Sequence, residues 1–290
     1  MSGAASAAVL WAVTVSALAA EPPQEIVVVK RGDLTAHAQV AEEFVDHCRV
    51  RARVINLDRD ELAPKLGPWP GAIVVAVGER ALDAAVGARY VISALAMAPR
   101  SGVLAAEALP PPELVLRALK AARPSLRRIA VVHGPMTDAL MSELQRAAVL
   151  IGLTVVEARA ASGPQALSEL HRIAGVPGAI EAIWLAPDPS VFTPQLFQYA
   201  LQLEIEQMIP LVAVTRQQVK SGALLAIDAD PRAVGRQAAD LANRLLAGER
   251  LAAIAHSQRE SAFDLIVNQD VARRLGVDVA ALSAQSARFE

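Results

Sequence analysis

The chain has 290 residues and a hydrophobic content of 53%, which is enough for one large domain or two of ordinary size. Aromatic residues make up only 3%, so Ala, Val, Leu and Ile must fill the cores, as in buried parallel sheets and the helices packed on them. The formal net charge is -2 and no basic run is long enough to follow a phosphate backbone, which argues against nucleic acid as a partner. Cys48 is the only cysteine, which excludes an intramolecular disulfide and a cysteine-based metal cluster.

The N-terminal segment has the pattern of a secretory signal peptide. Residues 1–20 carry no charged side chain, and the apolar run Ala7–Ala19 ends in the small-x-small triplet Ala17-Leu18-Ala19. We expect cleavage near Ala20 and export of the remainder. The basic residue that normally precedes such a run is missing, so we expect the true start to lie upstream of Met1. The alternative is an uncleaved membrane anchor, although the run is shorter than the roughly 20 residues that a spanning helix needs.

After this segment, short β-branched runs alternate with segments of helical spacing. The expected strands of the first half are Ile26–Val29, Arg53–Leu57, Ala72–Val77 and Arg89–Ala94. The segment Thr35–Arg49 is expected to form a helix because Val40, Phe44 and Cys48 fall on one of its faces. Regular alternation of this kind indicates βαβ units and a parallel sheet.

The second half repeats the first. Its expected strands are Ile129–His133, Leu153–Glu157, Ala182–Ala186 and Ile209–Val214. Each half then continues with Ser-Gly, a short strand, proline and a helix, which we place at Glu113–Ala122 and Arg232–Ala247. The pattern therefore predicts two similar α/β lobes in tandem, with chance similarity between βαβ segments as the alternative.

Motifs of catalysis and cofactor binding are missing from the sequence. It contains no Gly-x-Gly-x-x-Gly, Walker or Gly-x-Ser-x-Gly motif and no His-x-x-x-His or His-x-His pair. His37 and His47 lie about 15 Å apart along one expected helix, too far to share a metal ion directly. Asp228 and Asp230 lie close together, but Asp230 precedes Pro231 and is expected to cap the helix that follows. We therefore expect no catalytic residue, no metal and no cofactor.

The candidate binding residues follow from topology alone. Ligands of open parallel sheets bind outside the carboxyl ends of the strands, and the loops after the expected strands can be located in the sequence. The candidate ligand-binding residues are Arg31, Asp33, Gly78, Glu79, Pro135, Asp188, Thr215 and Arg216. Their mixture of charges suits a small polar or zwitterionic ligand, while the alternative for each is a solvated or capping side chain.

Asp188 is the preferred candidate because Pro187 and Pro189 restrict the backbone on either side of it. A carboxylate held there can accept a hydrogen bond from a ligand ammonium or hydroxyl group. The alternative is that Asp188 shapes its turn or caps a helix beginning near Thr193.

Several segments resemble a known family. They are Leu185–Phe192, Ile209–Ala213, Ser221–Ala226, Gly235–Ala239 and Phe263–Asn268. Together they resemble bacterial ABC-transporter substrate-binding proteins of the subfamily that includes tryptophan- and tyrosine-binding members. The similarity is good from about Arg127 to Val279 and weaker before that.

The resemblance implies a type I periplasmic-binding-protein fold, in which the chain crosses three times between two α/β lobes with parallel sheets. We expect crossings near Pro124, Ser221 and Gly248. The first lobe would then comprise residues 21–124 and 222–248, and the second residues 125–221 and 249–290, after a signal peptide at 1–20.

The function implied by the resemblance is capture of a small molecule in the periplasm for an ABC importer, with an inner-membrane permease as partner. We expect a monomer that performs no chemistry on its ligand. One departure from the family pattern is Gly78-Glu79-Arg80, where amino-acid-binding members often carry small residues, and it argues against an aromatic amino acid as the ligand. A sensory module of the same fold is the alternative, and an enzyme is disfavoured because no nucleophile–base pair was found.

Overall fold

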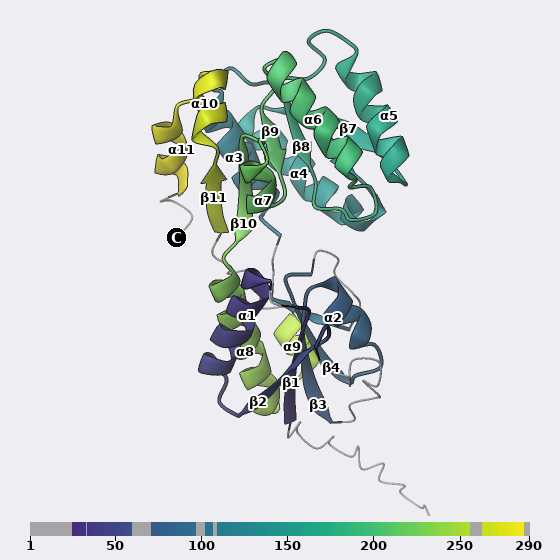
Figure 1. Cartoon of the computed structure of the whole chain (residues 1–290), viewed down its shortest axis with the longest axis vertical. Helices are drawn as coiled ribbons and strands as arrows, with labels where there is room; N and C mark the ends of the chain where they lie inside the picture. The colour runs from purple at the N-terminus through teal and green to yellow at the C-terminus, as the bar shows by residue number, and fades with distance from the viewer. Residues whose placement is uncertain are drawn as a thin grey trace, which may run out of the picture.

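The computed structural model describes residues 25–32, 34–59, 71–96, 102–106, 109–255 and 263–286. Two α/β lobes lie one above the other, each built around its own sheet (Figure 1). The expected signal peptide lies outside the described residues.

The strands agree with those expected from the sequence, with ends that differ by a few residues. In the first lobe they are β1 (Glu25–Lys30), β2 (Ala52–Asn56), β3 (Ala72–Val77), β4 (Tyr90–Ala94) and β5 (Leu104–Ala106). In the second they are β6 (Arg128–His133), β7 (Thr154–Arg159), β8 (Ala182–Leu185), β9 (Leu211–Ala213), β10 (Leu225–Ala229) and β11 (Phe263–Val267).

The helices occupy the segments between these strands. They are α1 (Thr35–His47), α2 (Glu79–Ala84), α3 (Pro112–Ala122), α4 (Asp138–Ile151), α5 (Gly163–Ala174), α6 (Pro194–Glu206), α7 (Arg216–Lys220), α8 (Pro231–Leu246), α9 (Leu251–Ala255), α10 (Gln269–Leu275) and α11 (Val279–Ser286). A 3₁₀ turn spans Pro135–Thr137.

The two sheets share one strand order. The first sheet runs β2-β1-β3-β4-β5 and is parallel throughout. The second runs β7-β6-β8-β9-β10 in the same pattern and adds β11, which pairs antiparallel with β10. This correspondence confirms the expected tandem of two similar lobes, each with a parallel sheet.

Helices cover both faces of each sheet, which explains the continuous apolar runs. Ile73 and Val75 of β3 pack in the core that includes α1 and α8, whereas Val74 and Ala76 pack on the opposite face with α2. All residues of β3 are buried. A strand that is covered on both sides has no solvent-facing positions, so its sequence does not alternate between apolar and polar residues.

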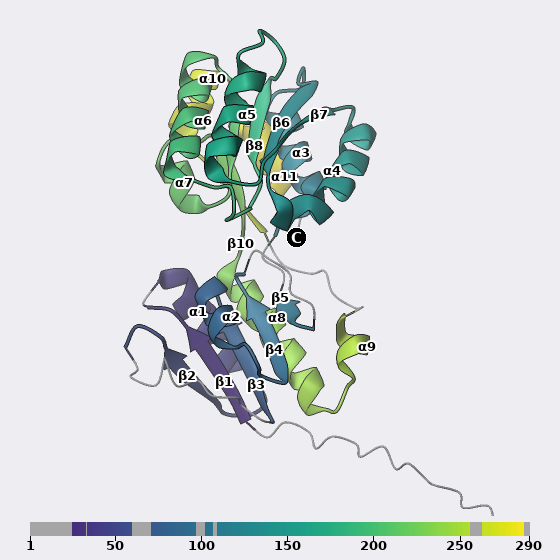
Figure 2. The same ribbon diagram turned by 90° about the vertical axis from the view of Figure 1, so that its right-hand side faces the viewer.

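The helix that follows the fifth strand of each half belongs to the other lobe. After β5, helix α3 packs in the second-lobe core, with Leu116 and Leu119 in the same cluster as Ile129. After β10, helix α8 packs on α1, with Val234 and Ala238 in the first-lobe core. Figures 1 and 2 show β10 leading from the upper lobe into α8 of the lower lobe.

These contacts correct the expected crossings. The chain passes between the lobes before α3 and between β10 and α8, not near Pro124 and Ser221. Ile254 of α9 still packs in the first-lobe core, so the third passage comes after α9 and before β11 rather than near Gly248. Local sequence shows that a helix has an apolar face, but both lobes offer a sheet that such a face can cover.

Close packing of α1 and α8 depends on Gly235. A Cβ atom added at Gly235 would lie 2.7 Å from the carbonyl oxygen of Val40 and 2.8 Å from Cβ of Glu43. At the same contact, Glu43 accepts hydrogen bonds from Arg232 at 2.7 Å and from Arg236 at 3.1 Å. The backbones of the two helices therefore approach at a position where only glycine fits.

We expect Gly235→Ala to lower the melting temperature of the protein. At an exposed position in a helix, the change from Gly to Ala stabilises the helix by about 1 kcal/mol. A lower melting temperature would therefore report the steric contact of the added methyl group with α1. Thermal unfolding followed by circular dichroism measures the effect. Asp240→Ala, on the exposed side of α8, is the matched control and should leave the melting temperature nearly unchanged. A melting temperature of Gly235→Ala at or above the parent value would contradict the interpretation.

Glu204 connects α6 to the starts of two strands of the second sheet. It is fully buried, and its Oε1 accepts hydrogen bonds from the backbone N–H of Leu211 at 2.7 Å and of Leu224 at 3.1 Å. Its Oε2 has no hydrogen-bond partner within the described part of the chain. Burial raises the pKa of this carboxyl to about 8, so it keeps its proton at neutral pH.

Stability should therefore depend on pH through Glu204. The unfolded chain loses this proton near pH 4.5, whereas the folded chain holds it up to about pH 8. Between these values the folded state binds more protons, so the free energy of unfolding should fall by about 1.4 kcal/mol per pH unit from this group.

Urea unfolding at pH 5 and pH 8 tests this expectation. Glu204→Gln should unfold with a weaker pH dependence than the parent protein, because an amide does not titrate. Glu206→Gln, an exposed change on the same helix, should keep the parental dependence. Equal dependence in the parent and Glu204→Gln would show that the carboxyl titrates normally.

Candidate functional site

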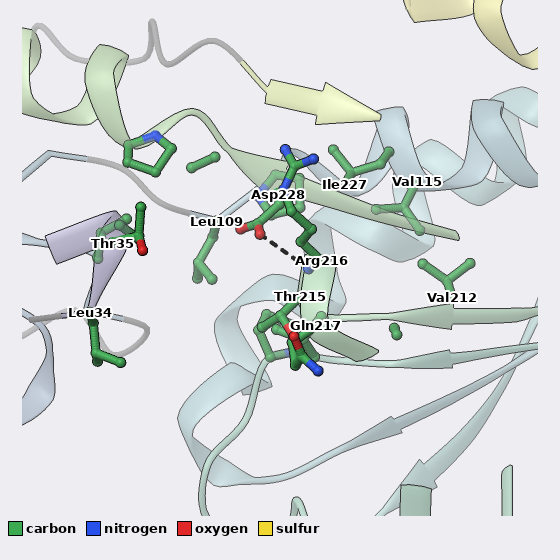
Figure 3. A pocket seen from close by; sticks show the side chains of 18 of the residues that line it. Leu34, Thr35, Leu109, Val115, Val212, Thr215, Arg216, Gln217, Ile227 and Asp228 are labelled. Carbon is green, nitrogen blue, oxygen red and sulfur yellow. Dashed lines mark hydrogen bonds between the residues drawn. The ribbon is translucent and has the colours of Figure 1, made fainter. Parts of the chain in front are cut away.

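A cavity of about 420 Å³ lies between the two lobes, beside β10 (Figure 3). The first lobe contributes residues from the start of α1 and from the loop after β4. The second lobe contributes the ends of β8 and β9, the start of α7 and the end of β10. Among the lining residues are Leu34, Thr35, His37, Leu95, Trp184, Pro187, Val212, Ala213, Val214, Thr215, Arg216, Gln217, Ile227 and Asp228. Both lobes therefore shape the same cavity, at the carboxyl ends of their strands.

The wall of the cavity is mainly apolar. Trp184, Val212 and Ile227 are buried in the second lobe and face the cavity from neighbouring strands. Leu34 of the first lobe is largely exposed, although it lines the cavity. Figure 3 shows Leu34 and Thr35 across the cavity from Thr215 and Gln217. A ligand held here would place an apolar part against the strands.

Asp228 and Arg216 are the charged side chains in this wall among the described residues. Asp228 Oδ2 accepts a hydrogen bond from the backbone N–H of Arg216 at 3.3 Å (Figure 3). The guanidinium of Arg216 donates to Asp264 at 2.9 Å, and Asp264 lies directly opposite Asp228 in the β10–β11 register. Arg216 therefore contacts both carboxylates, Asp264 through its guanidinium and Asp228 through its backbone N–H. Burial raises the pKa of Asp228 above its ordinary value, an effect that its contacts with Arg216 oppose.

His37 lines the cavity from the first lobe and stays neutral at pH 7. Burial is the main cause that lowers the pKa of its imidazole, and the nearby charges of Lys30 and Arg31 lower it further. The ring packs against Gly78, where an added Cβ would lie 2.7 Å from Cε1 of the histidine. Gly78 has a φ of 85°, a conformation that glycine adopts without strain.

Two of the candidates from the sequence, Thr215 and Arg216, line this cavity. Thr215 also caps α7: its hydroxyl accepts from the N–H of Gln218, whose side chain accepts from the N–H of Thr215 at 3.2 Å. This reciprocal pair fixes the loop after β9. Asp230 caps α8 as expected, accepting from the N–H groups of Arg232 and Ala233.

Asp188 is placed differently from the expectation of a ligand contact. Its side chain is 1% exposed and is not among the residues that line the cavity, although Pro187 is. Its Oδ2 accepts from the N–H of Gly134 at 3.0 Å and from both the N–H and hydroxyl of Thr137. Its Oδ1 accepts from the N–H and hydroxyl of Ser190. The carboxylate therefore joins the loop after β6 to the loop after β8.

The helix beginning near Thr193 has its own cap. The hydroxyl of Thr193 accepts from the N–H of Leu196 at 3.1 Å, so Asp188 does not cap α6. In this structure Asp188 therefore shapes its turn and does not cap a helix.

The remaining candidates lie outside the cavity wall or outside the described residues. Arg31 is exposed and forms an ion pair with Asp58 at 3.6 Å. Gly78 and Glu79 begin α2, Pro135 begins the 3₁₀ turn, and none of these residues lines the cavity. Asp33 lies outside the described residues. The sequence interpretation did not propose His37, Trp184 or Asp228 as ligand contacts, because their inclusion depends on which strands the two lobes bring together.

No group of three or more metal-ligating side chains occurs within the described ranges. Within the same ranges, no helix is long and apolar enough to cross a membrane.

Two lobes of one topology, with a cavity shaped by both, define a two-lobed binding protein with the type I periplasmic-binding-protein fold. Residues 113–287 match the family model described as ABC transporter substrate binding protein. Because this match covers more than half of the chain, the chain belongs to that family. The family is one of binding proteins that are typically not catalysts.

Solved structures agree with this fold. An ABC domain in complex with L-Trp from Streptococcus pneumoniae matches with a TM-score of 0.63 and 16% identity, covering 89% of this chain and 98% of that chain. A conserved domain protein from Vibrio cholerae matches with a TM-score of 0.61 and 18% identity over 90% of this chain and 98% of that chain.

The ligand-free, open structure of a substrate-binding protein with adhesive properties from Clostridium difficile matches with a TM-score of 0.61 and 16% identity, covering 88% of this chain and 95% of that chain. No curated protein matches the chain. At these identities the structural matches show the fold alone.

The geometry of Asp188 leads to a prediction about stability. Asp188→Ala should destabilise the protein by about 3 kcal/mol or more, because it leaves buried donors of Gly134 and Thr137 without an acceptor. Affinity for a ligand should change little once the protein is folded. Denaturant unfolding combined with calorimetry of ligand binding measures both quantities.

Asp46→Ala, an exposed change on α1, is the control and should leave both quantities near their parental values. Unchanged stability with tenfold weaker binding would instead make Asp188 a ligand contact.

Proposed function

We propose that this protein is the exported binding component of an ABC importer and captures a small polar or amino-acid-like molecule in the cavity between its lobes. The observation that carries the proposal is a single cavity whose wall comes from both lobes. Its volume of about 420 Å³ lies in the range of small-molecule sites.

Capture by closure follows from contact with both lobes. A ligand shifts the equilibrium toward a closed state only if it interacts better with that state than with the open one. A ligand between α1 of the first lobe and the β9–α7 loop of the second gains contacts when the lobes approach. Closure of this kind about a hinge is common in two-lobed binding proteins and gives a permease a surface that reports occupancy.

The compartment and partner are also part of the proposal. The uncharged segment before the first lobe and its small-x-small end support export to the periplasm. An inner-membrane permease is the partner that membership of the family suggests. The L-Trp bound in the streptococcal structure supports an amino-acid-like ligand. The mainly apolar wall of the cavity in this chain can hold the apolar part of such a molecule. We expect no catalysis.

Mass spectrometry of the mature protein isolated from its host should find a small molecule bound in one-to-one ratio. Thr35→Trp should reduce its affinity at least tenfold, because the indole would fill the cavity from an exposed position of the first lobe. Thr154→Trp, at an exposed position that starts β7, is the matched control and should bind as the parent does.

Uptake of the identified molecule by host cells lacking the protein provides the functional test. Loss of uptake supports the importer, whereas intact uptake together with binding would favour the alternative of a sensory module. Absence of any bound host molecule, with no thermal stabilisation by host extracts, would overturn the proposed function.

A further inference from the structure

The electrostatics of the cavity wall limit the class of ligand. The described lining residues include one carboxylate, Asp228, and one guanidinium, Arg216. His37 adds no positive charge at neutral pH because burial lowers the pKa of its imidazole. The balance of charge therefore depends on what Arg216 contacts outside the wall.

Arg216 is already engaged by a second carboxylate. Its Nη2 lies 2.9 Å from Oδ2 of Asp264, whereas its link to Asp228 is a backbone hydrogen bond of 3.3 Å. Asp228 and Asp264 face each other across the antiparallel β10–β11 pair. Two carboxylates and one guanidinium leave a net charge of about one negative unit beside the cavity.

The position of Asp228 directs that charge toward the cavity. Asp228 is half-buried and lines the cavity, whereas Asp264 is exposed and is not among the lining residues. The neighbours of Asp228 in the wall include Ile227 and Val212, which are buried. Water therefore screens the Asp228 carboxylate less than it would at a surface. A carboxylate in such surroundings favours a cation and repels an anionic group.

Most of the rest of the wall is apolar and fits an apolar body. Trp184, Val212 and Leu95 line the same cavity, and aliphatic or aromatic groups gain free energy by leaving water for such a surface. A polyol would leave hydroxyl groups against these side chains without hydrogen bonds, which is costly.

We propose that the ligand is an organic cation with an apolar body, and that Asp228 binds its ammonium group. This inference rests on the proposed function, because it assigns the substrate class of the same cavity. An α-amino acid carries a carboxylate as well and has no net positive charge, so the class is that of amines without a carboxylate. Asp228 acts as the residue that determines specificity, while Asp264 keeps Arg216 from neutralising it.

Two sets of matched probes test the proposal. One set is phenethylamine, L-phenylalanine and 3-phenylpropanoate, and the other is isoamylamine, L-leucine and 4-methylpentanoate. Within a set the body is constant while the ammonium and carboxylate groups vary. D-glucose serves as a neutral polar probe. Calorimetry and thermal shift with the mature full-length protein measure binding.

At least one of the two amines should bind at least tenfold more tightly than the carboxylate of its set. Asp228→Asn should weaken that binding by roughly ten- to a hundredfold, because a hydrogen bond to a charged group contributes about 1.5–3 kcal/mol. Asp240→Asn, an exposed change on α8, is the matched control and should bind as the parent does. The amine of that set should also bind more tightly than the amino acid, and the reverse order would contradict the proposal.

Other outcomes overturn the inference. They are preferential binding of a carboxylate or of glucose, binding of no ammonium probe, or unchanged affinity of a correctly folded Asp228→Asn variant. A neutral or anionic molecule found on the protein from its host would overturn the inference but leave the proposed function intact. Absence of any host ligand would remove both.

Discussion

The core of each lobe includes a helix that follows, in the sequence, the last parallel strand of the other lobe. Helix α3 leaves the first sheet and fills the second core, while α8 leaves the second sheet and packs on α1 of the first. Because these helices are buried in their new lobes, neither lobe can form its core without the other part of the chain. Residues at the first two passages, Leu109, Pro110, Ala229 and Pro231, line the cavity, so a rotation of one lobe against the other changes the shape of the site.

Buried carboxyl groups hold the second lobe in shape around the cavity. Asp188 joins two loops at the carboxyl ends of β6 and β8, and Glu204 holds the starts of β9 and β10 to α6. Asp188 accepts hydrogen bonds from several donors, whereas Glu204, among the residues that the structure describes, accepts from backbone groups through one of its oxygens. Burial of the Glu204 carboxyl is the main cause that raises its pKa. Two buried acidic residues thus fix loops and strand ends through hydrogen bonds to protein donors.

The site itself depends on an electrostatic arrangement that spans two strands and a loop. Asp228, Asp264 and Arg216 come from β10, β11 and the start of α7. Their pairing leaves Asp228 as the carboxylate beside a mainly apolar cavity. The fold sets the position of the cavity, and we infer that these side chains decide what it can bind.

The sequence by itself determined the local structure and the family. Strands such as Ala72–Val77 are evident because burial on both faces requires a continuous apolar run, and the repeated strand order followed from that pattern. The tertiary structure decided which lobe α3 and α8 join, that Asp188 is satisfied by protein donors, and that Asp228 lines the cavity. The physical reason is that periodicity in a sequence reports whether a side chain is buried. The residues that a buried side chain contacts depend on which distant segments the fold brings together.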